Sequence, residues 1–270
     1  MKILSKFLCL TLSVCLLFAL TSCDNNTDPE EIIEVIYYDG LGYVLKKNNN
    51  YKLVDVKSDI NDVRVPKTLP NGGIVNEIDL IESRLRCESF IVPDNVTVCL
   101  SDAWVKHLYI GERVDLDFIV NFDQNRTETI EISETNPKYY AKGNCIIEKE
   151  TQKLVYGFRT SEIPEGVKII GVSAFSDCIF EEIHIPDSVE RIEHSAFAYC
   201  RALQQVYIGE NVKTILDCAF YGTPTLVINC EADSKPSGWD SEWINKEKDS
   251  RPHKQGCKEV NWGVKRDAVE

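Results

Sequence analysis

Cys178 and Cys200 occupy the same place in two similar stretches of the sequence, VSAFSDC and HSAFAYC, 22 residues apart. Two such thiols could form a disulfide, and a cysteine within hydrogen-bond reach of a histidine could act as a nucleophile. However, the 4 histidines share no motif, and the chain contains no HExxH, GxSxG or glycine-rich phosphate loop. The acidic stretch DNNTDPEE lacks the ligand spacing of a calcium loop. The sequence therefore predicts no catalytic residue, no metal site and no cofactor.

Burial offers another explanation for Cys178 and Cys200, because a free cysteine behaves as a compact apolar side chain. We expect both to fill one layer of a core, although segments one strand spacing apart, about 4.8 Å, would also permit a disulfide. Cys230 and Cys257 flank the C-terminal segment of the chain. They are the two cysteines that best fit a disulfide in an exported protein.

The stretches around Cys178 and Cys200 belong to a longer internal repeat. When three copies are aligned on Phe175, Phe197 and Phe220, the spacings are 22 and 23 residues. Each copy opens with an isoleucine and continues with a valine, a second isoleucine and an Ala-Phe pair, while the residues between them vary. Repeats at residues 163–184, 185–207 and 208–228 predict a solenoid, in which each unit buries its apolar side against the next.

Local patterns predict a mainly β chain with short helical turns. The segments FEEIHI (180–185) and LQQVYI (203–208) end in alternating apolar positions, which is typical of half-buried strands. The segment before each phenylalanine is too short for a full helix, so we expect a turn or a single helical turn there. Apolar alternation on both sides of the Asn-rich residues 48–50 predicts a hairpin cap at one end. We expect a C-terminal cap at 229–264, packed by Trp239, Trp243 and Trp262.

The residues that the repeat leaves variable are the candidates for binding. The residue before the last apolar position of each strand should face solvent, and these residues should align on one open sheet face. Aromatic side chains on such a face suit partner binding, although exposed strands also favour tyrosine for its β-propensity. The expected row consists of Ile91, Tyr109, Glu131, His184, Tyr207 and Val227, and the candidate binding face is Tyr109, Glu131, His184 and Tyr207.

The first residues predict export. Lys2 and Lys6 precede a continuous apolar run from Phe7 to Leu20, as in a signal peptide. The end of the run, Leu-Thr-Ser-Cys, resembles the lipobox of bacterial lipoproteins, which implies a signal peptide at 1–22 and lipidation of Cys23. An acidic linker at 23–36 would then tether the domain to the membrane. The alternative is an uncleaved membrane anchor.

Charge excludes one class of partner. The chain has a formal net charge of −13, and loss of residues 1–22 would remove two lysines and no acidic residue. Such a balance repels phosphate backbones and anionic lipid surfaces. Nucleic acid is therefore not expected as a partner.

The repeat pattern resembles the BspA-type leucine-rich repeats of bacterial surface proteins. The shared features are an Ile-Pro step, a polar turn, Val-x-x-Ile and Ala-Phe-x-x-Cys-x-x-Leu. Residues 185–203 match them nearly throughout, 163–180 match well, and 208–226 lack the proline and the second cysteine. Residues 132–158 and 230–243 are similar to the hairpin-bearing unit and the usual ending of these proteins. The resemblance covers about residues 37–264 and implies a leucine-rich repeat domain over 37–270.

The resemblance also implies a function. It predicts a non-catalytic lipoprotein, anchored in the bacterial cell envelope and exposed at the surface, that adheres to host matrix proteins or to other cells. The alternative from a different class is an envelope scaffold or glycan-binding module that is not exposed outside. An enzyme is the least favoured class, because residues 132–158 contain no acid-base pair.

Overall fold

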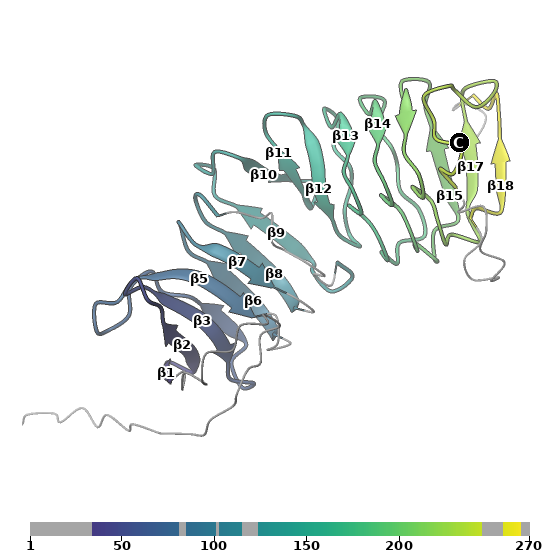
Figure 1. Cartoon of the computed structure of the whole chain (residues 1–270). Helices are drawn as coiled ribbons and strands as arrows, with labels where there is room; N and C mark the ends of the chain where they lie inside the picture. Colours follow the sequence, from purple (N-terminus) through teal and green to yellow (C-terminus); the bar gives the residue numbers. More distant parts are fainter. Residues whose placement is uncertain (1–33, 81–84, 101–102, 115–123, 245–255, 266–270) are drawn as a thin grey trace, which may run out of the picture.

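The computed structural model describes residues 34–80, 85–100, 103–114, 124–244 and 256–265. These residues form a curved, elongated stack of short strands, which Figure 1 shows from the N-terminal end at the lower left to the C-terminal end at the upper right. No helix occurs among them. The expected solenoid is therefore confirmed, whereas the expected short helical turns are not formed in the described residues. The predicted signal peptide, Cys23 and most of the linker lie outside those residues.

The N-terminal half consists of two sheets whose strands alternate along the chain. The first sheet has the order β1-β2-β3-β5-β7: β1 (Val35–Tyr38), β2 (Leu41–Leu45), β3 (Tyr51–Val56), β5 (Val75–Leu80) and β7 (Thr97–Leu100). The second has the order β4-β6-β8-β9: β4 (Asp62–Arg64), β6 (Arg86–Val92), β8 (Trp104–Ile110) and β9 (Thr129–Ile132). The pairs β3–β5, β4–β6 and β6–β8 are parallel, as expected where each turn returns to the same side.

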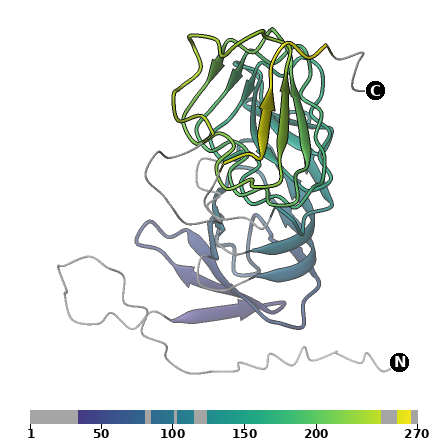
Figure 2. The ribbon, with the colours of Figure 1, turned by 90° about the vertical axis from the view of Figure 1, so that its right-hand side faces the viewer.

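The C-terminal half repeats this arrangement with shorter strands. Its larger sheet has the order β10-β11-β12-β13-β14-β16: β10 (Tyr139–Lys142), β11 (Cys145–Glu148), β12 (Lys153–Gly157), β13 (Ile169–Ile170), β14 (Arg191–Ile192) and β16 (Thr214–Ile215). The smaller sheet has the order β15-β17-β18: β15 (Gln205–Ile208), β17 (Val227–Cys230) and β18 (Glu259–Asn261). Figure 2 shows the yellow strand β18 beside the green strands at this end.

A column of phenylalanine rings holds the repeats together. The Phe175 and Phe197 ring centroids are 5.3 Å apart, those of Phe197 and Phe220 are 5.2 Å apart, and both pairs are nearly parallel. All three rings are fully buried, together with the repeated isoleucines and valines. Each stacked pair contributes about 0.5–1.5 kcal/mol beyond the burial of its area. The residues that recur in the sequence are thus the residues of the core.

The turn before each phenylalanine is not helical, because alternate N–H groups point to the next unit. In one unit these donors and their acceptors are Ser173 to His194, Phe175 to Ala196 and Asp177 to Ala198, at 2.8–3.0 Å. The intervening N–H groups bond within the turn, as Ser176 does to Ser173. Ser173 and Asp177 have φ values of 53° and 61°, outside the right-handed helical region. A helix would direct every donor into its own chain, so stacking between units excludes it.

Each end of the solenoid is covered. The expected hairpin forms as β2 and β3 around residues 46–50, with Asn49 at a φ of 63°. At the other end Trp239 and Trp243 are 3% exposed, and Trp243 meets Phe220 edge-on at 5.9 Å between centroids. The Trp239 indole donates to the Val212 carbonyl at 3.0 Å. The tryptophans therefore end the phenylalanine column rather than face a ligand.

Candidate binding surface

The start of two neighbouring strands, β6 and β8, brings large charged and aromatic side chains together. In β6 and β8 the register places Arg86 beside Trp104, and Glu88 and Lys106 project from the same strands. Trp104 is 38% exposed, although a side chain of this size is usually largely buried. The Arg126 guanidinium lies 4.9 Å from the Trp104 ring centroid, and that of Arg86 lies 5.9 Å from it. Cation–π attraction therefore holds the ring at the surface.

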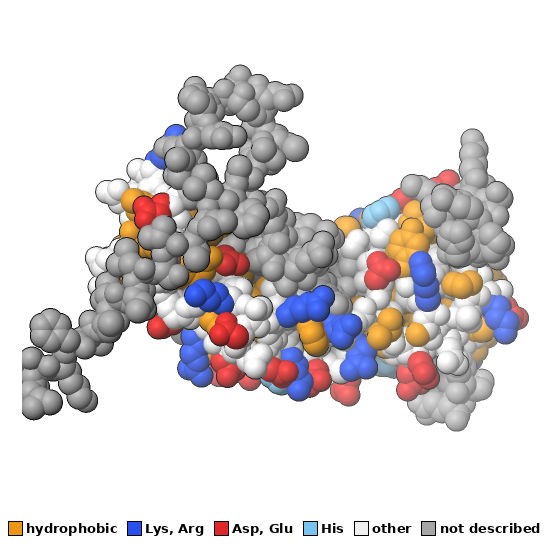
Figure 3. All heavy atoms as spheres, turned by 90° about the horizontal axis from the view of Figure 1, so that it is seen from below, with side chains coloured by type: hydrophobic (Ala, Val, Ile, Leu, Met, Phe, Trp, Pro, Cys, Tyr) orange, Lys and Arg blue, Asp and Glu red, His pale blue; other side chains and the backbone are white. Residues whose placement is uncertain are grey.

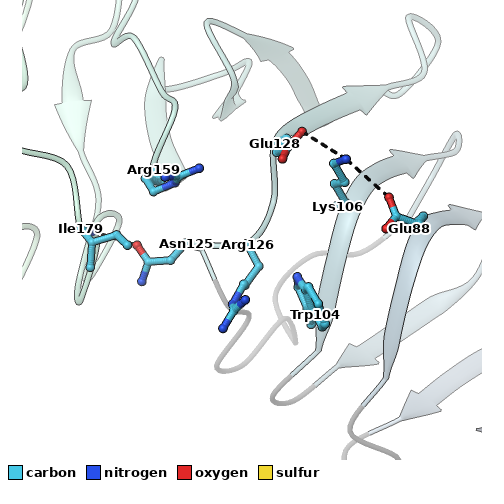
Figure 4. Close-up of a pocket in the computed structure, with 8 residues that line it drawn as sticks. All are labelled: Glu88, Trp104, Lys106, Asn125, Arg126, Glu128, Arg159 and Ile179. Atoms are coloured by element: carbon cyan, nitrogen blue, oxygen red, sulfur yellow. Dashed lines mark hydrogen bonds and ion pairs between the residues drawn. The ribbon is translucent and has the colours of Figure 1, made fainter. Parts of the chain in front are cut away.

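These side chains line an open groove of about 630 Å³. Lys106 lies between two carboxylates, with its Nζ 3.5 Å from Glu88 and 3.7 Å from Glu128 (Figure 4). The guanidinium groups of Arg126 and Arg159 come from the segment before β9 and from the turn after β12 (Figure 4). The full lining is Glu88, Trp104, Lys106, Asn125, Arg126, Glu128, Arg159 and Ile179. The lining of the groove thus combines an aromatic ring with both positive and negative side chains, although the chain as a whole has a strongly negative net charge.

The floor of the groove is fixed by amide side chains that reach the first clear repeat. Asn125 donates to the Asp177 carbonyl at 2.9 Å and accepts from the Ile179 N–H at 2.8 Å. Gln124, which is 7% exposed, donates to the Ala174 carbonyl at 2.8 Å. These bonds tie residues 124–126 to the repeat and so position Arg126 over Trp104. A site held by rigid elements keeps its geometry without help from the partner.

The structure brings together only part of the expected row of exposed residues. Ile91, Tyr109 and Glu131 are register neighbours across β6, β8 and β9, and Tyr109 is 38% exposed. The turn at Gly143 and Asn144 then interrupts the row. The side chain of Asn144 accepts a hydrogen bond from the Ile130 N–H at 2.9 Å. A hairpin-bearing unit at residues 132–158 was expected from the sequence. That its turn would interrupt the row of exposed residues was not expected.

One position in the expected row is wrong. His184 itself is exposed between the buried Ile183 and Ile185, in a segment that forms no strand but is joined to the next unit by a bridge from Glu182 to Gln205. The register partner of Tyr207 is Asn229, not Val227, which pairs with Gln205. Tyr207 and Asn229 are 22 positions apart, which is one repeat period, whereas the expected offset to Val227 was 20. The Asn229 side chain accepts from Asn261 at 3.1 Å.

The repeat cysteines are packed into the core. Cys178 and Cys200 are fully buried thiols, and the Cys200 thiol lies 3.0 Å from the Phe175 carbonyl. Burial raises the pKa of the Cys200 thiol well above its usual value. A thiol held neutral and away from solvent is a poor nucleophile, so these residues serve packing.

Cys230 and Cys257 lie close together at the C-terminal end. Both are thiols in the structure. Burial raises the pKa of Cys230 to about 12, and the nearby Cys257 adds to this rise. Burial also raises the pKa of Cys257 to about 11. Their disulfide stays a prediction.

Sequence reasoning missed the groove, because its parts are not repeated. Trp104 and Arg86 are 18 positions apart in units too degenerate to align, and only the β6–β8 register joins them. A usable signal was the exposed tryptophan in WVKHLYI, which lies outside the apolar alternation of Val105, Leu108 and Ile110.

The described residues also contain no helix long and apolar enough to cross a membrane.

Comparison with known proteins identifies the repeat. Residues 143–235 match the model of the BspA type leucine rich repeat region (6 copies). None of the curated proteins matches the sequence significantly. Leucine-rich repeat domains generally mediate protein–protein interactions through extended surfaces, and they are typically non-catalytic.

Three solved structures resemble this chain at low identity. A leucine-rich repeat protein from Eubacterium ventriosum is 15% identical, with a TM-score of 0.43 over 72% of this chain and 70% of that chain. The pneumococcal vaccine antigen PcpA is 11% identical, with a TM-score of 0.41 over 78% and 79%. A leucine rich cell surface protein from Faecalibacterium prausnitzii is 14% identical, with a TM-score of 0.36 over 88% and 97%. Residues 143–235 carry a BspA-type leucine-rich repeat region, and the described residues stack as a solenoid.

Proposed function

We propose that this chain is a non-catalytic lipoprotein of the bacterial cell surface, and that its solenoid binds a protein of the host matrix or of another cell. The observation that carries the proposal is the exposed Trp104 ring between Arg86 and Arg126, at the edge of a rigid groove. Tryptophan and arginine are the residues most enriched at the energetic centres of protein interfaces. In this arrangement they are already ordered, so little side-chain entropy is lost on binding.

The charges that line the groove indicate which kind of partner segment would bind there. Lys106 is neutralised by Glu88 and Glu128, whereas Arg126 and Arg159 present guanidinium groups to the groove (Figure 4). Figure 3 shows basic and acidic side chains intermingled on the described surface seen from below. A partner segment with an apolar or aromatic residue next to carboxylates would complement Trp104 and the two arginines.

Anchoring and location rest on the first residues. A lipobox-like Leu-Thr-Ser-Cys followed by an acidic tether would hold the solenoid at the membrane by acyl chains on Cys23. The tether would then let the groove face outward from the cell.

Binding of immobilised matrix proteins by the full chain in detergent tests the proposal. Trp104→Ala and Arg126→Ala should each weaken binding about thirtyfold, the effect of an interface hot spot. Tyr109→Ala tests the neighbouring strand face in the same assay. Tyr37→Ala removes an equally exposed ring on β1 and should leave affinity unchanged. If no matrix protein binds, or if the groove variants bind like the wild type, adhesion through this groove is wrong.

The location of the solenoid in the cell envelope distinguishes adhesion from the alternative function, an envelope scaffold or glycan-binding module. Protease added to intact cells should remove the solenoid if it is exposed at the surface. Full protection in intact cells, with digestion after lysis, would favour the scaffold.

A further inference from the structure

Three side chains with metal-ligating atoms converge on the surface of the repeat region, on the turns that precede Phe197 and Phe220. His194 Nδ1 lies 2.9 Å from Asp217 Oδ1. The ligand atoms of His194, Asp217 and Cys218 all lie within 4.8 Å of one another. The His194 and Asp217 side chains are 44% and 42% exposed, while Cys218 is 4% exposed.

Repeat stacking produces this convergence. Val172, His194 and Asp217 hold equivalent places in successive units, since the Ser173 N–H donates to the His194 carbonyl and the Ser195 N–H to the Asp217 carbonyl. The next position along the chain is Ser173, Ser195 and Cys218, with φ values of 53°, 55° and 56°. The unit that places a carboxylate beside the histidine therefore also replaces the serine of the other units with a cysteine.

The geometry does not fit a catalytic relay. In a nucleophile–histidine–acid relay the imidazole stands between the other two groups, which are then more than about 6 Å apart. Here the Asp217 oxygen and the Cys218 sulfur lie within 4.8 Å of each other as well as of the imidazole. Three ligand atoms that all lie this close to one another fit a coordination site better than a relay.

We propose that His194, Asp217 and Cys218 bind a divalent cation of the zinc class. Imidazole, carboxylate and thiolate are all established zinc ligands, and water would complete a tetrahedral set. Zinc bond lengths of about 2.0–2.3 Å place ligand atoms about 3.3–3.8 Å apart in a tetrahedron. The His194–Asp217 separation of 2.9 Å is shorter than this range, and all three ligand atoms lie within 4.8 Å of one another. Small movements of the two exposed side chains would close the site around the buried Cys218.

Charge and proton balance are consistent with this assignment. One carboxylate and one thiolate neutralise a divalent cation, so the coordinated site carries no net charge. Binding releases the Cys218 thiol proton to solvent. The imidazole stays neutral, but its proton must reside on Nε2 so that Nδ1 can donate its lone pair to the cation. The ion would cross-link two successive turns of the solenoid, and this role is independent of the groove and of the proposed adhesion.

Titration of the reduced full chain with Zn²⁺, followed by calorimetry, tests the site, and Co²⁺ provides a spectroscopic probe for a cobalt–thiolate bond. We expect one equivalent to bind and the cobalt–thiolate absorption to appear. His194→Val, Asp217→Asn and Cys218→Ser should each weaken binding at least about tenfold, the loss that even outer-shell substitutions cause. Bound zinc should also raise the Tm of the wild type but not of these variants.

The chain supplies its own controls for folding. Valine occupies the position of His194 in the preceding unit, and serine occupies that of Cys218 in both preceding units, so these variants should keep the wild-type Tm without metal. Cys257→Ser removes the partly exposed C-terminal thiol and should leave zinc binding intact. The proposal is overturned if no zinc binds. It is equally overturned if the three ligand variants bind like the wild type or if the cobalt–thiolate band depends on Cys257.

Discussion

Gly157 lies directly against the ring of Phe175, at the point where the inserted hairpin meets the first clear repeat. A Cβ atom on Gly157 would lie 1.8 Å from Phe175 Cε1 and 2.3 Å from Cζ, far inside van der Waals contact. The Gly157 N–H also donates to the Ala174 carbonyl at 2.8 Å, so the backbone has little room to retreat. The phenylalanine column therefore ends on a glycine at this side, as it ends on Trp243 at the other.

Gly157→Ala should destabilise the fold by about 1–3 kcal/mol, the usual cost of overpacking a core. The added methyl must displace the Phe175 ring, and this displacement disturbs its stacking on Phe197. Urea unfolding measures the effect as a lower midpoint. Gly209→Ala is the control, because its nearest neighbour is the Asp187 side chain at 3.3 Å. Equal midpoints for the two variants would contradict the assigned role of Gly157.

Much of the repeat region could be predicted from its sequence, because the buried residues are those that recur. The alignment on Phe175, Phe197 and Phe220 corresponds to a stacked column in space. The hairpin cap was readable from alternation around residues 48–50. In each case a local pattern specifies the burial directly, without knowledge of which segment lies opposite.

The features that could not be predicted depend on which segments of the chain lie opposite one another in the solenoid. A turn stabilised by the next unit has the same short apolar pattern as a helical turn, so the left-handed φ of Ser173 and Asp177 was not evident. The spacing between register partners is not constant along the chain, so a fixed offset does not identify them: Tyr109 follows Ile91 by 18 positions, whereas Asn229 follows Tyr207 by 22. Asp217 and His194 are 23 positions apart, and only stacking places their side chains together.

Asp94 should contribute stability at neutral pH that is lost in acid. Hydrogen bonds from the Lys67 ammonium and from the Glu112 N–H hold the pKa of this carboxyl below its usual value. The folded state therefore binds fewer protons, and the contribution is present above the unfolded pKa of about 3.9. It is lost as the pH falls through this value toward the lower folded pKa. Because the carboxyl is largely solvent-screened, we expect about 0.2–1 kcal/mol.

Asp94→Asn measures this contribution. The variant should be less stable than the wild type in urea near pH 7, and the difference should shrink as both are acidified below about pH 4. Lys213→Met removes a cation whose Nζ donates to a backbone carbonyl, that of Glu210 at 2.7 Å, and should show no such convergence. A difference between Asp94→Asn and the wild type that does not change with pH would assign the effect to something other than ionisation.

Thiol reactivity should separate the cysteines by burial. Burial raises the pKa of Cys87 and Cys145 to about 12, and Cys178 and Cys200 are fully buried. Cys257 is only half-buried, with a pKa raised to about 11, so it should be alkylated first among these thiols. Peptide mapping after brief alkylation of the reduced native chain identifies the labelled residue. Labelling of Cys178 or Cys200 as fast as Cys257 would contradict the packing described.

Oxidation provides a separate test of the C-terminal pair. If Cys230 and Cys257 form the expected disulfide after export, the unreduced protein should yield one cross-linked peptide that contains both. Cys230→Ser and Cys257→Ser should each abolish this peptide, and Cys218→Ser should leave it in place. Recovery of both cysteines as alkylated thiols from unreduced, exported protein would show that the pair stays reduced.

Cys23→Ala should release the chain from the membrane or leave its signal peptide uncleaved, without lowering the Tm of the solenoid. If Cys23 is the lipidated residue, its thiol carries the anchor, so a single substitution removes both the site of lipid attachment and the processing site. Cys15→Ala is the matched control, because Cys15 lies inside the apolar run and should not be required. Fractionation with metabolic labelling by palmitate reads out both effects. If Cys23→Ala remains wholly membrane-bound at the processed size, the lipid anchor is wrong. If it remains bound with residues 1–22 attached, the apolar run alone suffices as the anchor, as in the alternative interpretation of the N-terminus.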